Sequence, residues 1–190
     1  MGLQMAWAMP AVSLGPLCNN RCIFCAQGES RRAGMKPVGA KIRAALAGPG
    51  AAFRRRGVLA FVGGEPTLHS ALPAWLKAAR KGGSRRLVVQ TNGRRLADPG
   101  YARALREAGC DVLDVSLHGS TSAMHDYHTG VSGSFLQTLR GIKNARQAGL
   151  DVGVSVVVTR SNFRHLTDIV RLAHALGAQA VHMDMAQPCG

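Results

Sequence analysis

Short runs of apolar residues alternate along this chain with longer segments in which apolar residues recur every three or four positions. The short runs are rich in valine and leucine and end in glycine or polar residues, a pattern typical of strands buried on both faces of a parallel sheet. We therefore predict six strands, within residues 10–16, 57–64, 85–93, 111–119, 151–162 and 178–185.

The longer segments between the later strands have the features of amphipathic helices. Phe135, Leu139 and Ile142 are spaced i, i+4 and i+7, which places them on one helix face, and Gly149 follows as the expected C-cap. Pro99 and Gly109 mark the start and the end of another helix. These signals predict helices within residues 69–83, 98–110, 133–149 and 163–177.

The strict alternation of strands and helices predicts an α/β fold with a parallel sheet, and 190 residues suit one domain spanning 1–190. The chain stops just after the sixth strand, without a C-terminal extension, so we expect a truncated or fragmentary chain. In parallel α/β folds, ligands bind at the carboxyl ends of the strands. The segments that follow the strands are "CNNRCIFC", "GGEPTLH", "QTNG", "SLHGS", "TRSN" and "MDMAQPCG".

Composition narrows the class of protein. Apolar residues make up 46% of the chain, enough for a core, and no apolar run approaches the roughly 20 residues of a membrane span. The first ten residues lack the basic region and apolar core of a signal peptide. We therefore expect a cytoplasmic protein without a membrane partner, whose five cysteines stay reduced.

The net charge of +14 indicates either an anionic partner or a solvated basic surface. Nucleic acid is one such partner. Aromatic residues are only 5% of the chain, and none interleave with the arginine pairs as they would in a groove that stacks bases. The sequence therefore allows nucleic acid as a partner but does not support it.

Three cysteines, Cys18, Cys22 and Cys25, lie in the loop after the first predicted strand. Three thiolates can hold a four-iron cluster and leave one iron open, and an open metal position is the mark of a catalytic site. The alternative is a zinc site completed by Cys110 or by a histidine. Cys110 and Cys189 are lone residues, and Cys110 fits a small buried hydrophobic position at a helix-to-strand junction.

The cysteine spacing, with Phe24 before the last cysteine and "GGEPTLH" after the second strand, resembles the radical S-adenosylmethionine (radical SAM) superfamily. The similarity is to the branch with the molybdenum-cofactor cyclase and the peptide maturases. It implies a partial (βα)6 TIM-like barrel, a [4Fe-4S] cluster on the three catalytic cysteines, and S-adenosylmethionine (SAM) on the open iron.

The resemblance also implies an oxidoreductase- or lyase-type activity. The cluster would cleave SAM reductively to a 5′-deoxyadenosyl radical, and this radical would abstract hydrogen from a peptide or small-molecule substrate. An electron donor such as flavodoxin or ferredoxin would reduce the cluster.

The segment after the second strand supplies the first cofactor-binding candidates, and the resemblance adds Phe24 to them. Gly63 and Gly64 have no side chains, so a ligand can approach their backbone closely, and by resemblance they bind the SAM amino group. Glu65 lies in a stretch crowded with arginine and lysine, so it has either a functional role or a salt bridge. Pro66 fixes the turn into the following helix.

Later strand ends supply further cofactor-binding candidates. By resemblance, Thr91 points to substrate or SAM, and Ser116 matches a position that contacts SAM. A serine between Val115 and Leu117 also needs a polar partner. His118 ends the same strand and is either a ligand-facing residue or a satisfied loop histidine.

The last two strand ends and two motifs have competing interpretations. A family pattern places Asn162, and either Met183 or Met185, near SAM, whereas a methionine taken alone fits core packing. Asn92-Gly93 is a turn signal. The histidines 118, 125 and 128 match no standard metal-ligand spacing.

Three other functions stay open. An RNA-modifying radical SAM enzyme would account for the positive charge. A zinc-binding interaction module would use the cysteines without catalysis. An inactive fragment would form the cluster but have an open barrel unable to hold substrate.

Overall fold

The computed structural model describes residues 9–28, 39–47 and 57–186, and within them six strands form one sheet. The strand order is β1-β2-β3-β4-β5-β6, and every neighbouring pair is parallel. The predicted α/β fold with a partial parallel barrel is therefore confirmed. The strands are β1 (Ala11–Ser13), β2 (Val58–Val62), β3 (Arg86–Thr91), β4 (Val112–Ser116), β5 (Asp151–Val158) and β6 (Ala180–Met185).

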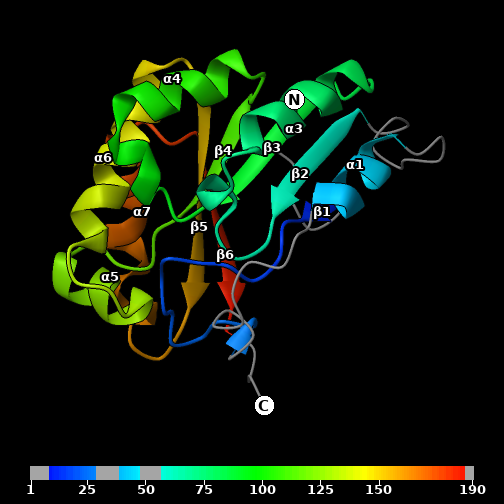
Figure 1. The fold of residues 1–190 in the computed structure, drawn as a ribbon. Coiled ribbons are helices and arrows are strands. Elements are labelled where there is room, and N and C mark those ends of the chain that lie inside the picture. The colour runs from blue at the N-terminus through cyan, green and yellow to red at the C-terminus, as the bar shows by residue number, and fades with distance from the viewer. Residues whose placement is uncertain (1–8, 29–38, 48–56, 187–190) are drawn as a thin grey trace.

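Helices connect successive strands and lie mainly on one face of the sheet (Figure 1). The α-helices are α1 (Gly39–Ala47), α3 (Leu72–Lys81), α4 (Pro99–Glu107), α5 (Ser122–Thr129), α6 (Ser134–Gln147) and α7 (Leu166–Ala175). Short 3-10 helices are η3 (Pro66–Leu68), η4 (Arg94–Ala97) and η5 (Phe163–His165).

The predicted helices are present, and two further helices were not predicted. Helix α1 precedes β2, and α5 begins after Thr121, whose hydroxyl caps the helix by accepting a hydrogen bond from Met124 N–H. Gly149 is not the C-cap of α6. Ala148 has that position, and Gly149 follows it with φ +77°, a conformation that favours glycine.

Residue alternation along each strand separates an outer face from an inner face. Leu59, Leu87 and Leu113 belong to the main core that the helices cover. Their sequence neighbours Ala60, Val88 and Val112 point to the opposite face and form a separate small cluster at the amino-terminal end of the inner face. The inner face is therefore apolar near the amino ends of the strands.

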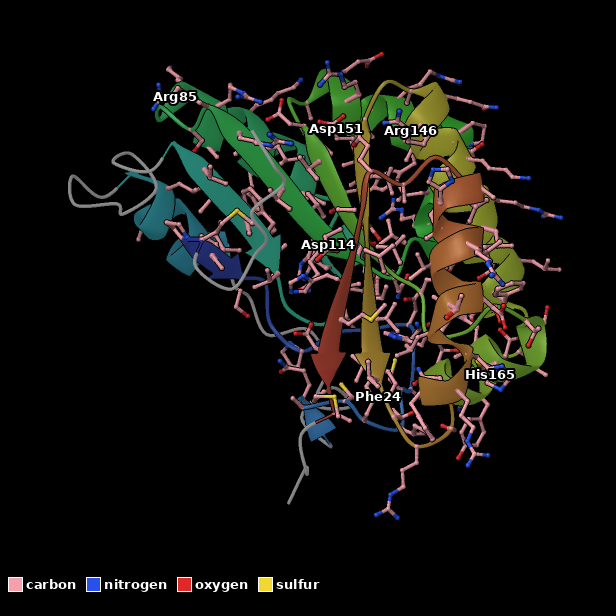
Figure 2. All side chains as sticks on the ribbon, turned by 180° about the vertical axis from the view of Figure 1, so that it is seen from behind. Phe24, Arg85, Asp114, Arg146, Asp151 and His165 are labelled. Atoms are coloured by element: carbon pink, nitrogen blue, oxygen red, sulfur yellow. The ribbon has the colours of Figure 1, made fainter. Side chains whose placement is uncertain are left out.

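The amino ends of the strands are joined by ion pairs. Arg80 contacts Asp111 at 2.6 Å, and Arg86 contacts Asp151 at 3.3 Å. Figure 2 shows Asp151 at the end of the molecule opposite Phe24. Cys110 lies at this end, fully buried in the main core, and burial raises its pKa to about 12. The prediction of a small buried hydrophobic position is confirmed.

None of the described helices combines the length and the apolarity that crossing a bilayer would require.

Candidate functional site

A cavity of about 340 Å³ lies where the cysteine loop, residues 15–28, meets the carboxyl ends of the strands. Figure 1 shows this loop in blue along the arrowheads of β5 and β6, and Figure 2 places Phe24 at the same end. The loop lines the cavity with Pro16, Cys18, Asn20, Cys22, Phe24, Cys25, Ala26 and Gln27. The strand ends add Gly63, Gly64, Gln90, Thr91, Asn92, Ser116, His118, Ser155, Val157, Asp184, Met185 and Ala186.

The first support of the cysteine loop is the glycine pair that follows β2. Gly64 N–H donates to the carbonyl of Gly15 at 2.7 Å. A Cβ on Gly64 would lie 2.2 Å from the carbonyl oxygen of Leu17 and 2.4 Å from that of Pro16. Gly63 has φ +134°, and a Cβ there would also meet Gly15 O, at 2.7 Å. The two backbones therefore pack at a distance that only glycine allows.

The second support comes from the end of α5. The backbone N–H of Arg21 donates to the carbonyl of Thr129 at 2.8 Å, and that of Ile23 donates to His128 O at 3.1 Å. The Arg21 guanidinium adds hydrogen bonds to Gly130 O. These contacts fix the part of the loop between Cys18 and Cys25.

The third support comes from the residues that follow β3. The side-chain amide of Asn92 donates to Asn19 Oδ1 at 2.6 Å. Arg94 donates to the carbonyl of Asn19 at 2.5 Å and to Asn20 Oδ1 at 2.9 Å, while Gln137 accepts from its Nε at 2.6 Å. One arginine side chain therefore ties the cysteine loop to the end of β3 and to α6.

The three thiols share the cavity, and their surroundings suit thiolate ligands. Asn20 N–H donates to Cys18 Sγ at 3.3 Å, and the Asn92 amide lies 4.0 Å from the same sulfur. Burial raises the pKa of Cys18, and these donors oppose the shift because they stabilise the thiolate. Metal binding would itself deprotonate the thiol.

Among the described residues, no three histidine, cysteine or acidic side chains converge as ligands of a single metal ion. Cys110 lies at the other end of the strands, and Cys189 falls outside the described residues. A zinc site completed by Cys110 is therefore contradicted. Three thiols spread around a shared hollow, with amide donors to one sulfur, fit an inorganic cluster larger than one ion.

Glu65 is buried behind the cavity and held by four donors. One carboxylate oxygen accepts from the N–H and the hydroxyl of Thr67 and from the hydroxyl of Thr91, at 3.0, 2.6 and 2.6 Å. The other accepts from Asn92 N–H at 2.6 Å. Burial raises the pKa of Glu65, and these hydrogen bonds oppose that shift. Glu65 forms no ion pair within the described part of the chain, so the salt-bridge alternative is wrong.

His118 lines the cavity and is 4% exposed. Its Nδ1 accepts a hydrogen bond from Val157 N–H at 3.2 Å, so the ring proton is on Nε2. Burial lowers the pKa of His118 well below its usual value, which keeps the ring neutral. Phe24 meets the ring edge-on with centroids 4.7 Å apart. Asn162 fixes the strand ends by donating to the carbonyls of His118 and Val157.

The other two histidines of this segment, His125 and His128, form hydrogen bonds within the protein. His125 Nδ1 accepts from His118 N–H at 3.1 Å, and its buried Nε2 has no partner among the described residues. Burial lowers the pKa of His125 to about 4. His128 bonds Met124 O and the Thr159 hydroxyl. A metal site on these histidines has no support, in line with their non-standard spacing.

The predicted residues divide into two groups. Nine of them line the cavity: Cys18, Cys22, Phe24, Cys25, Gly63, Gly64, Thr91, Ser116 and His118. Four do not: Glu65, Pro66, Asn162 and Met183. Met183 has the parity of the outer face and pairs in register with Val156 of the main core, so Asp184 faces the cavity instead. Met185, the last residue of β6, also lines the cavity although it shares the parity of Met183.

The inner-face positions Gln90, Ser155 and Asp184 were missed by the sequence analysis. Each lies on a strand and lines the cavity. A polar residue inside an otherwise apolar strand indicates such a position, and the sequence analysis applies this pattern only to Ser116. The same parity also places Asp114 on the inner face, because Asp114 pairs in register with Gln90.

Comparisons with known proteins agree on one family. The model of the Radical SAM superfamily matches residues 12–173. An AdoMet-dependent heme synthase of Oleidesulfovibrio alaskensis is 34% identical over 133 residues, covering 70% of this chain and 34% of its own length. A probable GTP 3′,8-cyclase of Metallosphaera sedula is 30% identical over 185 residues, covering 94% of this chain and 56% of its own length. The chain thus spans about a third to a half of these relatives.

Solved structures with the same fold include two proteins with bound S-adenosylmethionine. SuiB of Streptococcus suis superposes with a TM-score of 0.70 at 15% identity, over 94% of this chain and 40% of SuiB. The protein anSMEcpe superposes with a TM-score of 0.69 at 18% identity, over 94% of this chain and 52% of that protein. At these identities the likeness concerns the fold.

Proposed function

The chain belongs to the radical SAM superfamily, and from this premise we propose that it cleaves SAM reductively with a [4Fe-4S] cluster held by Cys18, Cys22 and Cys25. The observation that supports the proposal is the meeting of these cysteines with Gly63 and Gly64 around one cavity at the carboxyl ends of the strands. When bound, the reduced cluster supplies the electron that converts SAM to methionine and a 5′-deoxyadenosyl radical, which takes a hydrogen atom from the substrate.

The residues that line the cavity would bind and orient SAM. Gly63 and Gly64 present backbone without side chains, which suits the amino group of SAM. Ser116 has an intermediate exposure, and within the described residues its hydroxyl has no hydrogen-bond partner, so it is available to SAM. Thr91 borders the same space. Phe24 lines the cavity from the loop, where its ring meets that of His118.

The predicted residues outside the cavity would act by positioning others. Glu65 joins Thr91 and Asn92 to the turn after β2, and Pro66 starts the 3-10 helix of that turn. Asn162 holds the carbonyl of His118. Met183 has no such role, and Met185 takes its proposed place beside SAM.

We propose one core domain over residues 1–190, because the described strands form a single sheet. The substrate would be a peptide or a small molecule, since SuiB is also solved bound to the precursor peptide SuiA and the names of the relatives refer to the small molecules heme and GTP. An electron carrier such as flavodoxin or ferredoxin would reach the cluster beside Ile23, which is 55% exposed. Free thiols at Cys18, Cys22 and Cys25 suit a reducing cytoplasm.

The test is anaerobic reconstitution of the full-length protein with iron and sulfide, followed by reduction and addition of SAM. We expect a brown protein that forms 5′-deoxyadenosine, measured by liquid chromatography. A colourless protein that binds one zinc ion and leaves SAM intact would contradict the proposal.

A further inference from the structure

The inner face of the sheet carries two carboxyl groups that have no lysine or arginine partner among the described residues. Asp184 lines the cavity with its side chain 30% exposed, and Asp114 is buried beside it on β4. Asp114 accepts hydrogen bonds from the Ser155 hydroxyl at 2.6 Å and from the Gln90 amide at 3.4 Å. His182 lies 3.9 Å from Asp184. Within the described part of the chain, neither carboxylate meets a lysine or an arginine.

The lack of a lysine or arginine beside Asp114 and Asp184 is unusual in a chain with 24 lysine and arginine residues and 10 acidic residues. Other aspartates of the structure do have arginine partners: Asp111 pairs with Arg80 and Asp151 with Arg86, at the opposite end of the strands. The described lining of the cavity contains no lysine or arginine at all. Within the described part of the chain, the cavity is thus a place where a cation would meet carboxyl groups that no lysine or arginine compensates.

His118 is the second observation that points to a ligand. It is 4% exposed and lines the cavity, Nδ1 is occupied by Val157 N–H, and the remaining nitrogen Nε2 has no partner among the described residues. A ligand acceptor in the cavity would give this Nε2–H donor a partner. Because the ring is neutral, it does not compensate the negative charge of Asp184.

We propose that the β6 side of the cavity is a substrate subsite for a protonated amine or guanidinium group, with Asp184 as its contact and Asp114 behind it, and that His118 donates a hydrogen bond to an acceptor of the same substrate, such as an amide carbonyl. This inference rests on the proposed function, because it assigns the Gly63–Gly64 side of the cavity to SAM. A basic amino-acid residue in a peptide has both groups.

The electrostatics of the pair agree with this assignment. Burial raises the pKa of both Asp114 and Asp184. A cation bound at Asp184, with Asp114 behind it, would favour the charged form of both carboxyl groups. An anionic substrate group would face the opposite balance, since it would lie beside two carboxyl groups.

The test is calorimetric binding of acetylated, amidated tripeptides Gly-X-Gly to the full-length protein loaded with cluster and SAM, where X is lysine, arginine, glutamine or glutamate. We expect the lysine and arginine peptides to bind about tenfold more tightly than the glutamine peptide, and the glutamate peptide to bind most weakly. Asp184→Asn should reduce the preference for lysine over glutamine to about twofold or less.

Two further variants separate the roles of the residues. Asp168→Asn changes an exposed aspartate on α7 that pairs with Arg171, and it should keep the full preference. His118→Ala should weaken the lysine and glutamine peptides by the same factor, because it removes a donor and no charge. A preference that also falls with rising ionic strength would support charge recognition.

Three outcomes would overturn the inference. They are a wild-type protein without preference for lysine or arginine, a preference that survives Asp184→Asn, and an Asp184→Asn variant whose only defect is weaker SAM binding. Formation of 5′-deoxyadenosine by the wild-type protein without peptide is measured separately. Its absence would refute the proposed function, whereas peptide binding tests the subsite directly.

Discussion

Asn92 donates a 2.6 Å hydrogen bond from its backbone N–H to the buried carboxylate of Glu65, and this bond joins the ends of β2 and β3 behind the cavity. The partner of Glu65 is thus a neighbouring strand end and not a basic side chain. The side-chain amide of Asn92 donates to Asn19, so Asn92 also connects Glu65 to the cysteine loop.

Replacing Glu65 with glutamine should therefore destabilise the fold and the site together. Both carboxylate oxygens accept from donors, so the NH2 group of a glutamine would face another donor wherever it is placed. We expect a loss of about 2 kcal/mol in the free energy of unfolding, measured with urea, and a lower iron content after reconstitution.

The matched control for this variant is Glu107→Gln, at an exposed position near the end of α4. It should change the free energy of unfolding by less than about 0.5 kcal/mol. Equal stability of the Glu65→Gln and Glu107→Gln proteins would refute the structural role of the Glu65 network.

The cysteines should differ sharply in their effect on iron binding. Changing Cys18, Cys22 or Cys25 to alanine should lower iron from roughly four atoms per chain to below about one and abolish 5′-deoxyadenosine formation. Cys110→Ala should keep both, at a cost of about 1 kcal/mol for a small core cavity, because Cys110 lies in the main core. Iron analysis and visible absorption provide the measurement, and full iron retention in Cys22→Ala would contradict the assignment.

Gly64→Ala should be more harmful than its size suggests. The new Cβ would lie 2.2 Å from Leu17 O, so the cysteine loop or the turn after β2 must move. We expect a loss of about 2–3 kcal/mol, seen as a lower urea midpoint. The comparison is Gly100→Ala in α4, where the nearest atom to a Cβ is Asp98 Oδ1 at 3.1 Å. If both variants unfold at the wild-type midpoint, the close packing of the loop does not constrain the fold.

Stability should fall with pH below about 6.5 because of His125. Its pKa is about 4 in the fold, against about 6.5 when unfolded, so between these values the unfolded chain binds the proton and the folded chain does not. The contribution of His125 is complete above pH 6.5 and decreases by up to about 3 kcal/mol as the pH approaches 4.

Urea unfolding between pH 7 and pH 4.5 measures this effect. His125→Gln removes one titrating group and should reduce the pH dependence, and the remaining part is expected from His118, whose pKa is also lowered by burial. Substitution of the exposed His174 in α7 should leave the pH dependence unchanged. An unaltered slope in the His125→Gln protein would show that other groups cause the pH dependence.

The sheet could be predicted from sequence because its strands are short valine and leucine runs with sharp polar ends. Helix α1 could not, since its nine residues lack a marked apolar stripe. Helix α5 was hidden in the polar segment "HGSTSAMHDYHTG", where only the cap at Thr121 gave a signal. Local patterns thus identify elements that bury one regular face, and they miss short helices stabilised by caps and tertiary contacts.

The site was predictable where a residue type is itself informative, as for the cysteines and Gly63. It was not predictable where the role depends on partners distant in sequence. Asn162 and Glu65 are each saturated by hydrogen bonds that no spacing reveals. On β6, the choice between Met183 and Asp184 depends on one residue of register, which decides the face of the sheet.

The supports of the cysteine loop also determine when the site can form during synthesis. The loop leaves the ribosome first, but Arg94 and Thr129 hold it from 74 and 108 residues further along the chain. Contacts across such separations form late, because long loops must close before the contacts stabilise anything. A nascent chain shorter than about 130 residues therefore lacks the contacts that Thr129 and Gly130 make with the loop between Cys18 and Cys25. We therefore expect the loop to take its final conformation only after α5 has formed, because the end of α5 supplies these contacts.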